Sequence, residues 1–169
     1  FVYGCGIICL TVCRASALQI GIYRGNSMIR TYRESDLPVV MEIWLDTNIK
    51  AHSFISKEYW ISNYEMVKKV LPNAELYVYE DDDTKLIDGF IGLTDSYIEG
   101  LFVKDIAQSK GIGKQLLDYV KRIKSTLCLR VYQENIRAVC FYQREQFQIQ
   151  SENIDDNTDE KEFFMTWSI

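Results

Sequence analysis

Residues 101–117 read LFVKDIAQSKGIGKQLL, and they carry the most informative pattern in the chain. An apolar run ends at Val103, a polar turn follows, and Gly111 and Gly113 open a segment whose apolar residues recur at helical spacing. The pattern predicts a strand, a glycine turn and a helix. Because the first N–H groups of a helix have no intrahelical partner and lie at the positive end of its dipole, we expect phosphate binding at residues 109–114.

Two common phosphate-binding patterns do not fit this turn. A Walker loop requires a glycine where Gln108 stands and Ser or Thr where Gln115 stands. A dinucleotide-binding turn requires a third glycine in place of Leu116, and it belongs to the first strand of its domain. What remains is Gln-x-x-Gly-x-Gly after a strand. A glycine-rich helix start that binds nothing stays open as the alternative.

Length and composition describe one domain with an ordinary core. The chain has 169 residues, of which 47% are apolar, and its net charge is -5. Since nucleic-acid binding needs clustered Lys and Arg, this charge argues against a nucleic-acid partner and leaves room for a cationic one. The apolar run at 1–12 is too short to span a bilayer, which needs about 20 residues, so we expect no membrane partner.

Residues 1–27 differ from the rest because they lack Asp and Glu, and we interpret them as a leader or non-native segment before a single domain at 28–169. In the domain, Cys128 and Cys140 are expected to pack as small hydrophobes rather than form a disulfide. This use of cysteine favours a cytoplasmic location.

The domain alternates between strand-like and helix-like segments. A strand at 28–33 precedes a helix that begins at Ser35 or Asp36, and a second helix covers 56–71. The further strands are expected at 75–79, 85–93, 96–103, 127–132, 147–150 and 163–168, and the further helices at 111–124 and 135–145. The acidic residues 80–83 are expected to form a solvated turn, and residues 151–161 an acidic, mobile connection.

A second motif, NIRAVCFY at residues 135–142, follows the glycine turn after one strand. The two motifs and the order of elements resemble the GNAT N-acetyltransferase superfamily, whose helix carries Asn-x-x-Ala-x-x-Phe-Tyr. The resemblance covers residues 28–169. It implies an α/β (α+β) fold with a mixed, mostly antiparallel, seven-stranded sheet and about four flanking helices. It also implies that the sheet is splayed at the strands ending near Val103 and Tyr132.

Further residues resemble small stand-alone bacterial members of this superfamily. These members share a His-x-Phe-Ile loop, a Tyr-Trp pair and a Thr-Trp or Ser-Trp pair near the end, which here are His52, Phe54, Ile55, Tyr59, Trp60, Thr166 and Trp167. Some of them acetylate protein lysines. Several aromatic residues are candidates for lining an acceptor slot: Tyr59, Trp60, Tyr97, Tyr132 and Trp167. The alternative is that most of them belong to the core, which is the better interpretation for Trp167.

The resemblance implies acetyl-CoA as the coenzyme, with coenzyme A as the product. Backbone N–H groups at 101–103 would bind the pantetheine arm and polarise the thioester carbonyl, and Tyr142 would protonate the departing sulfur. The residues implied to bind the coenzyme are Leu101, Phe102, Val103, Gln108, Ser109, Lys110, Gly111, Ile112, Gly113, Lys114, Asn135 and Tyr142. No metal is implied.

The residue that removes a proton from the acceptor amine stays open. A lysine amine has a pKa of about 10.4, so it is mostly protonated at neutral pH. Strand alternation makes Glu99 a candidate base, the ordinary pKa of an imidazole makes His52 another, and a chain of water molecules is a third possibility. Gln146 stands where the family has glycine, and it would be strained if that position needs a positive φ.

These residues predict an acetyl-CoA-dependent N-acetyltransferase that transfers the acetyl group directly to a primary amine. The acceptor is a protein lysine or N-terminus, or a small cationic amine, and the enzyme is a monomer or homodimer. A non-catalytic acyl-CoA-binding sensor or scaffold is the alternative function.

Overall fold

The computed structural model describes residues 22–23 and 27–169. The strands are β1 (Ile22–Tyr23), β2 (Ser27–Thr31), β3 (Glu75–Asp81), β4 (Ile87–Thr94), β5 (Tyr97–Val103), β6 (Thr126–Tyr132), β7 (Gln148–Ile154) and β8 (Lys161–Ser168). The α-helices are α1 (Leu37–Ala51), α2 (Lys57–Val70), α3 (Ile112–Ile123) and α4 (Ile136–Arg144). Three short 3-10 helices complete the described elements: η1 (Glu34–Asp36), η2 (Leu71–Asn73) and η3 (Asp105–Ala107).

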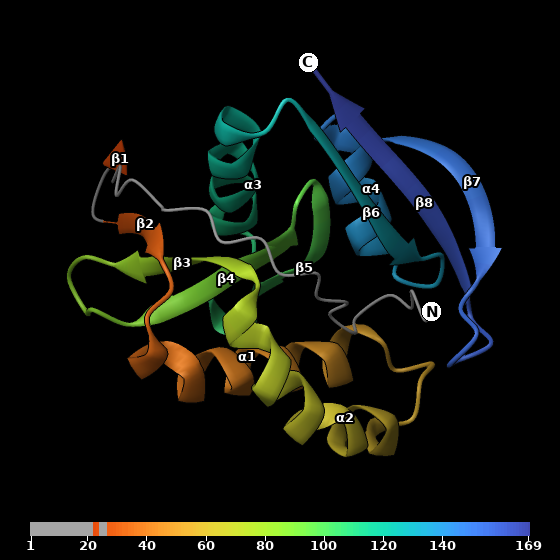
Figure 1. Cartoon of the computed structure of the whole chain (residues 1–169), viewed down its shortest axis with the longest axis horizontal. Helices are drawn as coiled ribbons and strands as arrows, with labels where there is room; N and C mark the ends of the chain where they lie inside the picture. Colours follow the sequence, from red (N-terminus) through yellow and green to blue (C-terminus); the bar gives the residue numbers. More distant parts are fainter. Residues whose placement is uncertain (1–21, 24–26) are drawn as a thin grey trace.

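The strands form one mixed sheet in the order β1-β2-β3-β4-β5-β6-β8-β7 (Figure 1). All neighbouring pairs are antiparallel except β5 and β6, which are parallel. The seven predicted strands are present as β2 to β8, and the two-residue β1 pairs with the outer edge of β2. The predicted fold class is therefore confirmed. Most of the segment 1–27, interpreted above as a leader, lies outside the described residues.

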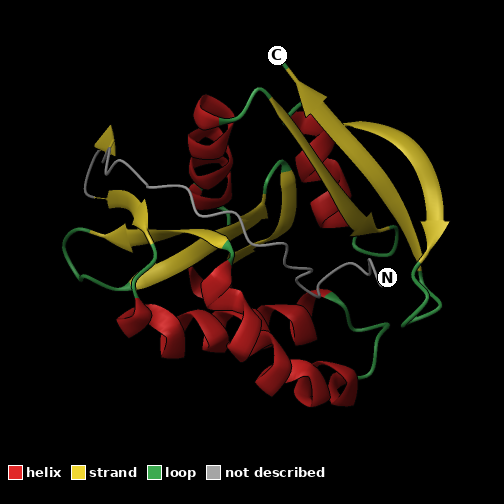
Figure 2. Ribbon diagram, in the orientation of Figure 1, coloured by secondary structure: helices red, strands yellow, loops and turns green. Residues whose placement is uncertain are grey.

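Helices cover both faces of the sheet (Figure 2). Helices α1 and α2 pack on one face, where their core includes Trp44 and Trp60, and α3 and α4 pack on the other, where the core includes Leu116 and Val139. The apolar residues that recur at helical spacing after the glycine turn are Ile112, Leu116, Leu117 and Val120, and all four are buried in α3. The spacing of apolar residues along the sequence therefore identified the face of α3 that meets the sheet.

Two expectations from the sequence are wrong in detail. The segment predicted as a mobile connection is strand in part, because β7 continues to Ile154 and pairs with β8. The remaining turn is closed by hydrogen bonds from the N–H groups of Thr158 and Asp159 to the carbonyl of Asp155, which is 1% exposed. Cys140 does not pack as a small hydrophobe, because it lies on the exposed face of α4.

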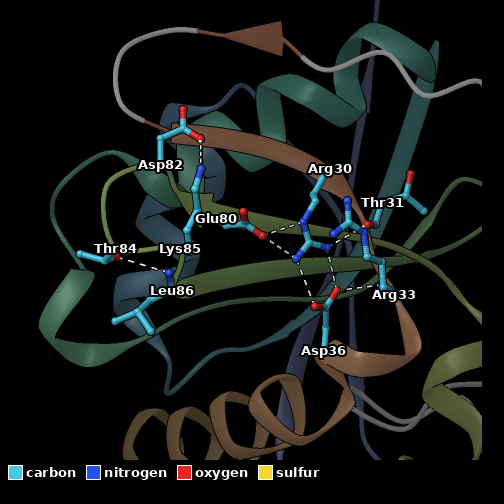
Figure 3. Close-up of polar contacts among 9 residues, drawn as sticks. All are labelled: Arg30, Thr31, Arg33, Asp36, Glu80, Asp82, Thr84, Lys85 and Leu86. Atoms are coloured by element: carbon cyan, nitrogen blue, oxygen red, sulfur yellow. Dashed lines mark hydrogen bonds and ion pairs between the residues drawn. The ribbon is translucent and has the colours of Figure 1, made fainter.

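A buried ion cluster joins β2 to the start of α1 (Figure 3). The Arg30 guanidinium binds both carboxylate oxygens of Asp36, at 2.7 and 3.1 Å, and its Nε lies 2.8 Å from a carboxylate oxygen of Glu80. Asp36 also accepts the backbone N–H of Arg33 at 2.8 Å. Arg30 and Asp36 are 8% and 7% exposed. The predicted solvated turn is confirmed at 81–85, but Glu80 belongs to this buried cluster.

We expect Asp36→Asn to lower the free energy of unfolding by about 3 kcal/mol, because removing one partner leaves a buried guanidinium undercompensated. Burial alone would raise the pKa of Asp36, but the hydrogen bonds and charge of Arg30 and the Arg33 N–H together lower it. A carboxyl group whose pKa is lowered by folding stabilises above its unfolded pKa, so the difference from wild type should shrink as the pH falls below 3.8. Urea unfolding at several pH values measures both effects.

Asp46→Asn is the matched control, because it removes an ion pair with Lys50 in which both side chains are about half exposed. It should change the free energy of unfolding by less than about 0.5 kcal/mol. Equal losses from the two substitutions would show that burial of the Arg30 cluster does not matter.

Candidate active site

The sheet opens between its two parallel strands. Strands β5 and β6 are paired only at Tyr97 and Cys128, near their beginnings. On its other side β5 pairs with β4 up to Val103, and β6 pairs with β8 up to Tyr132. The predicted splay near the ends of these strands is therefore present. Figure 1 shows β6 and β8 diverging from the rest of the sheet, with α3 and α4 beside the gap.

The gap exposes backbone groups of β5. The N–H of Lys104 donates to the carbonyl of Asp88 at 2.8 Å, which continues the ladder between β5 and β4. The backbone N–H groups of successive residues in a strand point alternately to the strands on its two sides. The N–H groups of Leu101 and Val103 therefore point away from β4, toward the gap. The N–H of Phe102 points toward β4. Of the three backbone groups predicted to meet the pantetheine arm, two therefore face the gap.

The glycine turn adds further N–H groups beside the gap. Gly111 is the N-cap of α3 with φ of 83°, and no side chain caps the helix start. The first N–H groups of α3 are therefore left without intrahelical partners. Ser109 also has a positive φ, 62°. A Cβ at Gly113 would lie 3.3 Å from Leu101 Cδ2, so the absence of a side chain lets the helix start pack against β5.

Side-chain hydrogen bonds hold this turn in place. Gln108 Nε2 donates to the carbonyl of Val103 at 3.0 Å. Arg137, from the first turn of α4, donates to Gln108 Oε1 at 2.6 Å and to Ser109 Oγ at 3.1 Å. Arg137 was not among the residues predicted from the sequence. A signal was present, since a cation in the first turn of a helix opposes the dipole and needs an acceptor elsewhere.

The two lysines of the turn differ in their surroundings. Lys114 Nζ lies 3.0 Å from a carboxylate oxygen of Asp118 and 3.0 Å from one of Glu145. These two acids offset much of the positive charge that we expected Lys114 to bring to the turn. Lys110 is exposed. The backbone N–H groups and Lys110 are therefore expected to attract an anion more strongly than Lys114 does.

Glu99 occupies a β-bulge next to the gap. Gly100 pairs with Gly92 and Ile98 with Leu93, so Glu99 is the extra residue of β5. Its carboxylate also lies near the Cys128 thiol, whose pKa is raised by burial and by the Glu99 charge. Burial raises the pKa of Glu99 to about 7. A carboxyl group with this pKa can exchange a proton at neutral pH.

Helix α4 places the other predicted residues. Asn135 is its N-cap and accepts the N–H of Ala138 at 3.1 Å. Tyr142, two turns further along, is 7% exposed and packs against Phe141 and Phe147. Both residues of the predicted Asn-to-Tyr motif therefore project from one short helix beside the gap.

His52 meets α4 rather than standing free in a loop. Its Nε2 lies 3.1 Å from Asn135 Nδ2, and its ring packs against Trp60 and Tyr132. Burial lowers the pKa of His52 to about 4. Trp60 and Tyr132, both considered for an acceptor slot, are 1% and 0% exposed and belong to the core.

The chain is similar in sequence to known acetyltransferases. The sequence profile "Acetyltransferase (GNAT) domain" matches residues 72–149. Peptidyl-lysine N-acetyltransferase YiaC of Escherichia coli is 35% identical over 144 residues, which cover 84% of this chain and 97% of YiaC. Peptidyl-lysine N-acetyltransferase YjaB of Salmonella typhimurium is 30% identical over 121 residues, covering 72% of this chain and 83% of that protein.

Solved structures show the same fold. The solution structure of apo YjaB from Escherichia coli superposes with a TM-score of 0.75 at 24% identity, over 83% of this chain and 97% of that one. YncA from Salmonella typhimurium, solved with its cofactor acetyl-CoA, superposes with a TM-score of 0.60 at 15% identity, over 85% and 94% of the two chains.

The chain therefore belongs to the GNAT family, and it is an N-acetyltransferase. Acetyl-CoA is the acetyl donor of this family and the coenzyme of this chain. The N–H groups that face the gap from Leu101 and Val103, and the uncapped start of α3, fit an extended arm that ends in a pyrophosphate. None of the helices in the described part of the chain is long and apolar enough to cross a bilayer.

We expect Gly111→Asp to weaken acetyl-CoA binding roughly 100-fold, because unit charges about 5 Å apart near a protein surface repel by roughly 3 kcal/mol. Gly111→Asn is the matched control, since Asn has the same size and also tolerates a positive φ. A Cβ at this position meets nothing within 4 Å, so both side chains have room. Calorimetric titration of the full chain with acetyl-CoA and with coenzyme A measures both affinities. Equal binding of acetyl-CoA by the two variants would show that the pyrophosphate does not bind at this turn.

Proposed function

We propose that this enzyme transfers the acetyl group of acetyl-CoA directly to the ε-amino group of a lysine in a polypeptide. The observation that carries the choice of acceptor is the 35% identity with YiaC, which is named a peptidyl-lysine N-acetyltransferase, over most of both chains. The net charge of -5 also suits a cationic acceptor. A protein N-terminus or a small polyamine is the second candidate acceptor. The cytoplasmic location and the state of monomer or homodimer stay predictions.

The proposed roles of the residues follow from their positions around the gap. The coenzyme supplies the acetyl group as a thioester. The N–H groups of Leu101 and Val103 would bind its arm and polarise the thioester carbonyl, because both point into the opening between β5 and β6. The start of α3 around Gly111 would bind the pyrophosphate.

Two residues are proposed to move protons. Glu99 would accept a proton from the acceptor ammonium, because its carboxylate lies at the bulge beside the gap and has a pKa of about 7. Tyr142 would hold a proton at its phenol oxygen for the departing sulfur. Its placement on α4, in the same helix as Asn135, supports this role.

Tyr142→Phe should lower kcat about 100-fold on a lysine-containing peptide while leaving the Kd for acetyl-CoA within about 2-fold, since only a proton donor is removed. The measurement is mass-spectrometric acetylation of lysine peptides, N-terminal amines and spermidine, with calorimetry for the coenzyme. Tyr119→Phe is the matched control. Tyr119 lies on α3, is similarly buried and packs against Tyr77 of β3. A wild-type enzyme that acetylates spermidine but no lysine peptide would contradict the proposed acceptor.

If Glu99 is the base, kcat/KM for the acceptor should rise with pH around a midpoint near 7, because only the ionised carboxylate accepts a proton and the pKa of Glu99 is about 7. Glu99→Gln should remove this dependence and lower the rate at least 100-fold. The exposed Asp95, in the turn before β5, supplies the control Asp95→Asn, which should leave the profile unchanged. If Glu99→Gln reacted as fast as wild type, solvent and not Glu99 would accept the proton.

A further inference from the structure

The contact between His52 and Asn135 determines how protons are arranged on both side chains. Asn135 Oδ1 accepts the N–H of Ala138 at 3.1 Å, so this end of the carboxamide is the oxygen. The other end, Nδ2, can only donate, and it lies 3.1 Å from His52 Nε2. His52 Nε2 must therefore be the unprotonated nitrogen that accepts, and the proton of the neutral imidazole must be on Nδ1.

The surroundings of His52 favour the neutral form of its imidazole. Its ring stacks on Trp60 at 5.3 Å between centroids and meets the edges of Phe54 and Tyr132 at 5.7 and 5.3 Å. Trp60 and Tyr132 are almost completely buried. Tyr132 is the only titratable side chain among these ring contacts, and its hydroxyl donates to Asp155 at 2.6 Å. No charged group among the ring partners therefore stabilises an imidazolium at this position.

We propose that His52 is a positioning residue that fixes the Asn135 carboxamide in the orientation needed for acetyl transfer, and that it is not the general base. With Oδ1 held by α4 and one hydrogen of Nδ2 held by His52, the amide plane cannot rotate, and the second hydrogen of Nδ2 is left for the coenzyme. The Nε2 lone pair is occupied, so the imidazole has none to offer an acceptor amine. This inference rests on the proposed function and on the contact with the coenzyme that the family resemblance implies for Asn135.

Three substitutions separate positioning from base catalysis. Gln places its terminal oxygen near the position of Nε2 and can still accept from Asn135, Asn is too short to do so, and Phe keeps the ring without an acceptor. We expect His52→Gln to keep kcat/KM for acetyl-CoA within about 3-fold of wild type, and His52→Asn and His52→Phe to lose roughly 10- to 100-fold. A base role predicts instead that Gln is as inactive as Phe, and that result would overturn the inference.

A packing control completes the kinetic test. Phe54→Leu disturbs the same group of rings but leaves the His52 acceptor and Asn135 in place. It should lower the melting temperature while leaving kcat/KM for acetyl-CoA within about 3-fold. A loss as large as that of His52→Phe would show that the rings matter only for packing, and it would overturn the positioning role.

Nitrogen-15 NMR gives a readout that does not depend on activity. His52 is the only histidine in the chain, so the imidazole spectrum of the full protein contains one spin pair. We expect a protonated Nδ1, an unprotonated Nε2 and a midpoint of protonation at about pH 4. An Nε2–H tautomer, or a midpoint near the ordinary 6.5, in an enzyme that acetylates its acceptor would overturn this inference alone. A wild-type protein that acetylates no acceptor would overturn the proposed function. The contact between His52 and Asn135 would then have no role in catalysis.

Discussion

The whole site depends on two parallel strands that pair at one end and separate at the other. A complete ladder between β5 and β6 would use the N–H groups of Leu101 and Val103 internally, and no backbone donors would remain for a ligand. The gap is stable because each strand is secured on its other side, β5 by β4 and β6 by β8. Cores on both faces of the sheet hold its two halves in this separated arrangement. The proposed binding of the coenzyme would therefore use hydrogen-bonding capacity that the sheet itself leaves unsatisfied.

Helix α4 is the element that coordinates the parts around this gap. Arg137 in its first turn fixes the side chain of Gln108, which in turn holds the end of β5. Asn135 at its start meets His52 from the connection between α1 and α2. Tyr142 lies on the same helix. A shift of α4 would thus move the glycine turn, the carboxamide and the proposed acid together, which would link the proposed binding of the coenzyme to the geometry of transfer.

The sequence predicted what depends on local pattern. Apolar spacing located the helices and strands, the glycines located the turn, and the resemblance placed Asn135 and Tyr142. Contacts between distant residues could not be predicted in this way. Arg30 meets Glu80 across 50 positions and His52 meets Asn135 across 83, and neither pairing leaves a trace in periodicity. The end of β7 was missed because it is a polar edge strand, exposed at most positions, in which apolar alternation is absent.

The end of α4 shows how packing overrides a local preference. Gln146 has φ of 69°, so the position does require the left-handed conformation for which glycine is usual. Its N–H donates to the carbonyl of Gln143, and the N–H of Phe147 donates to that of Tyr142, both at 3.0 Å. A non-glycine residue in this conformation costs roughly 1 kcal/mol, whereas burying a phenylalanine gains roughly 2. Because Phe147 is 3% exposed and packs on Tyr142, its burial offsets the strain of Gln146 and holds the proposed acid in place.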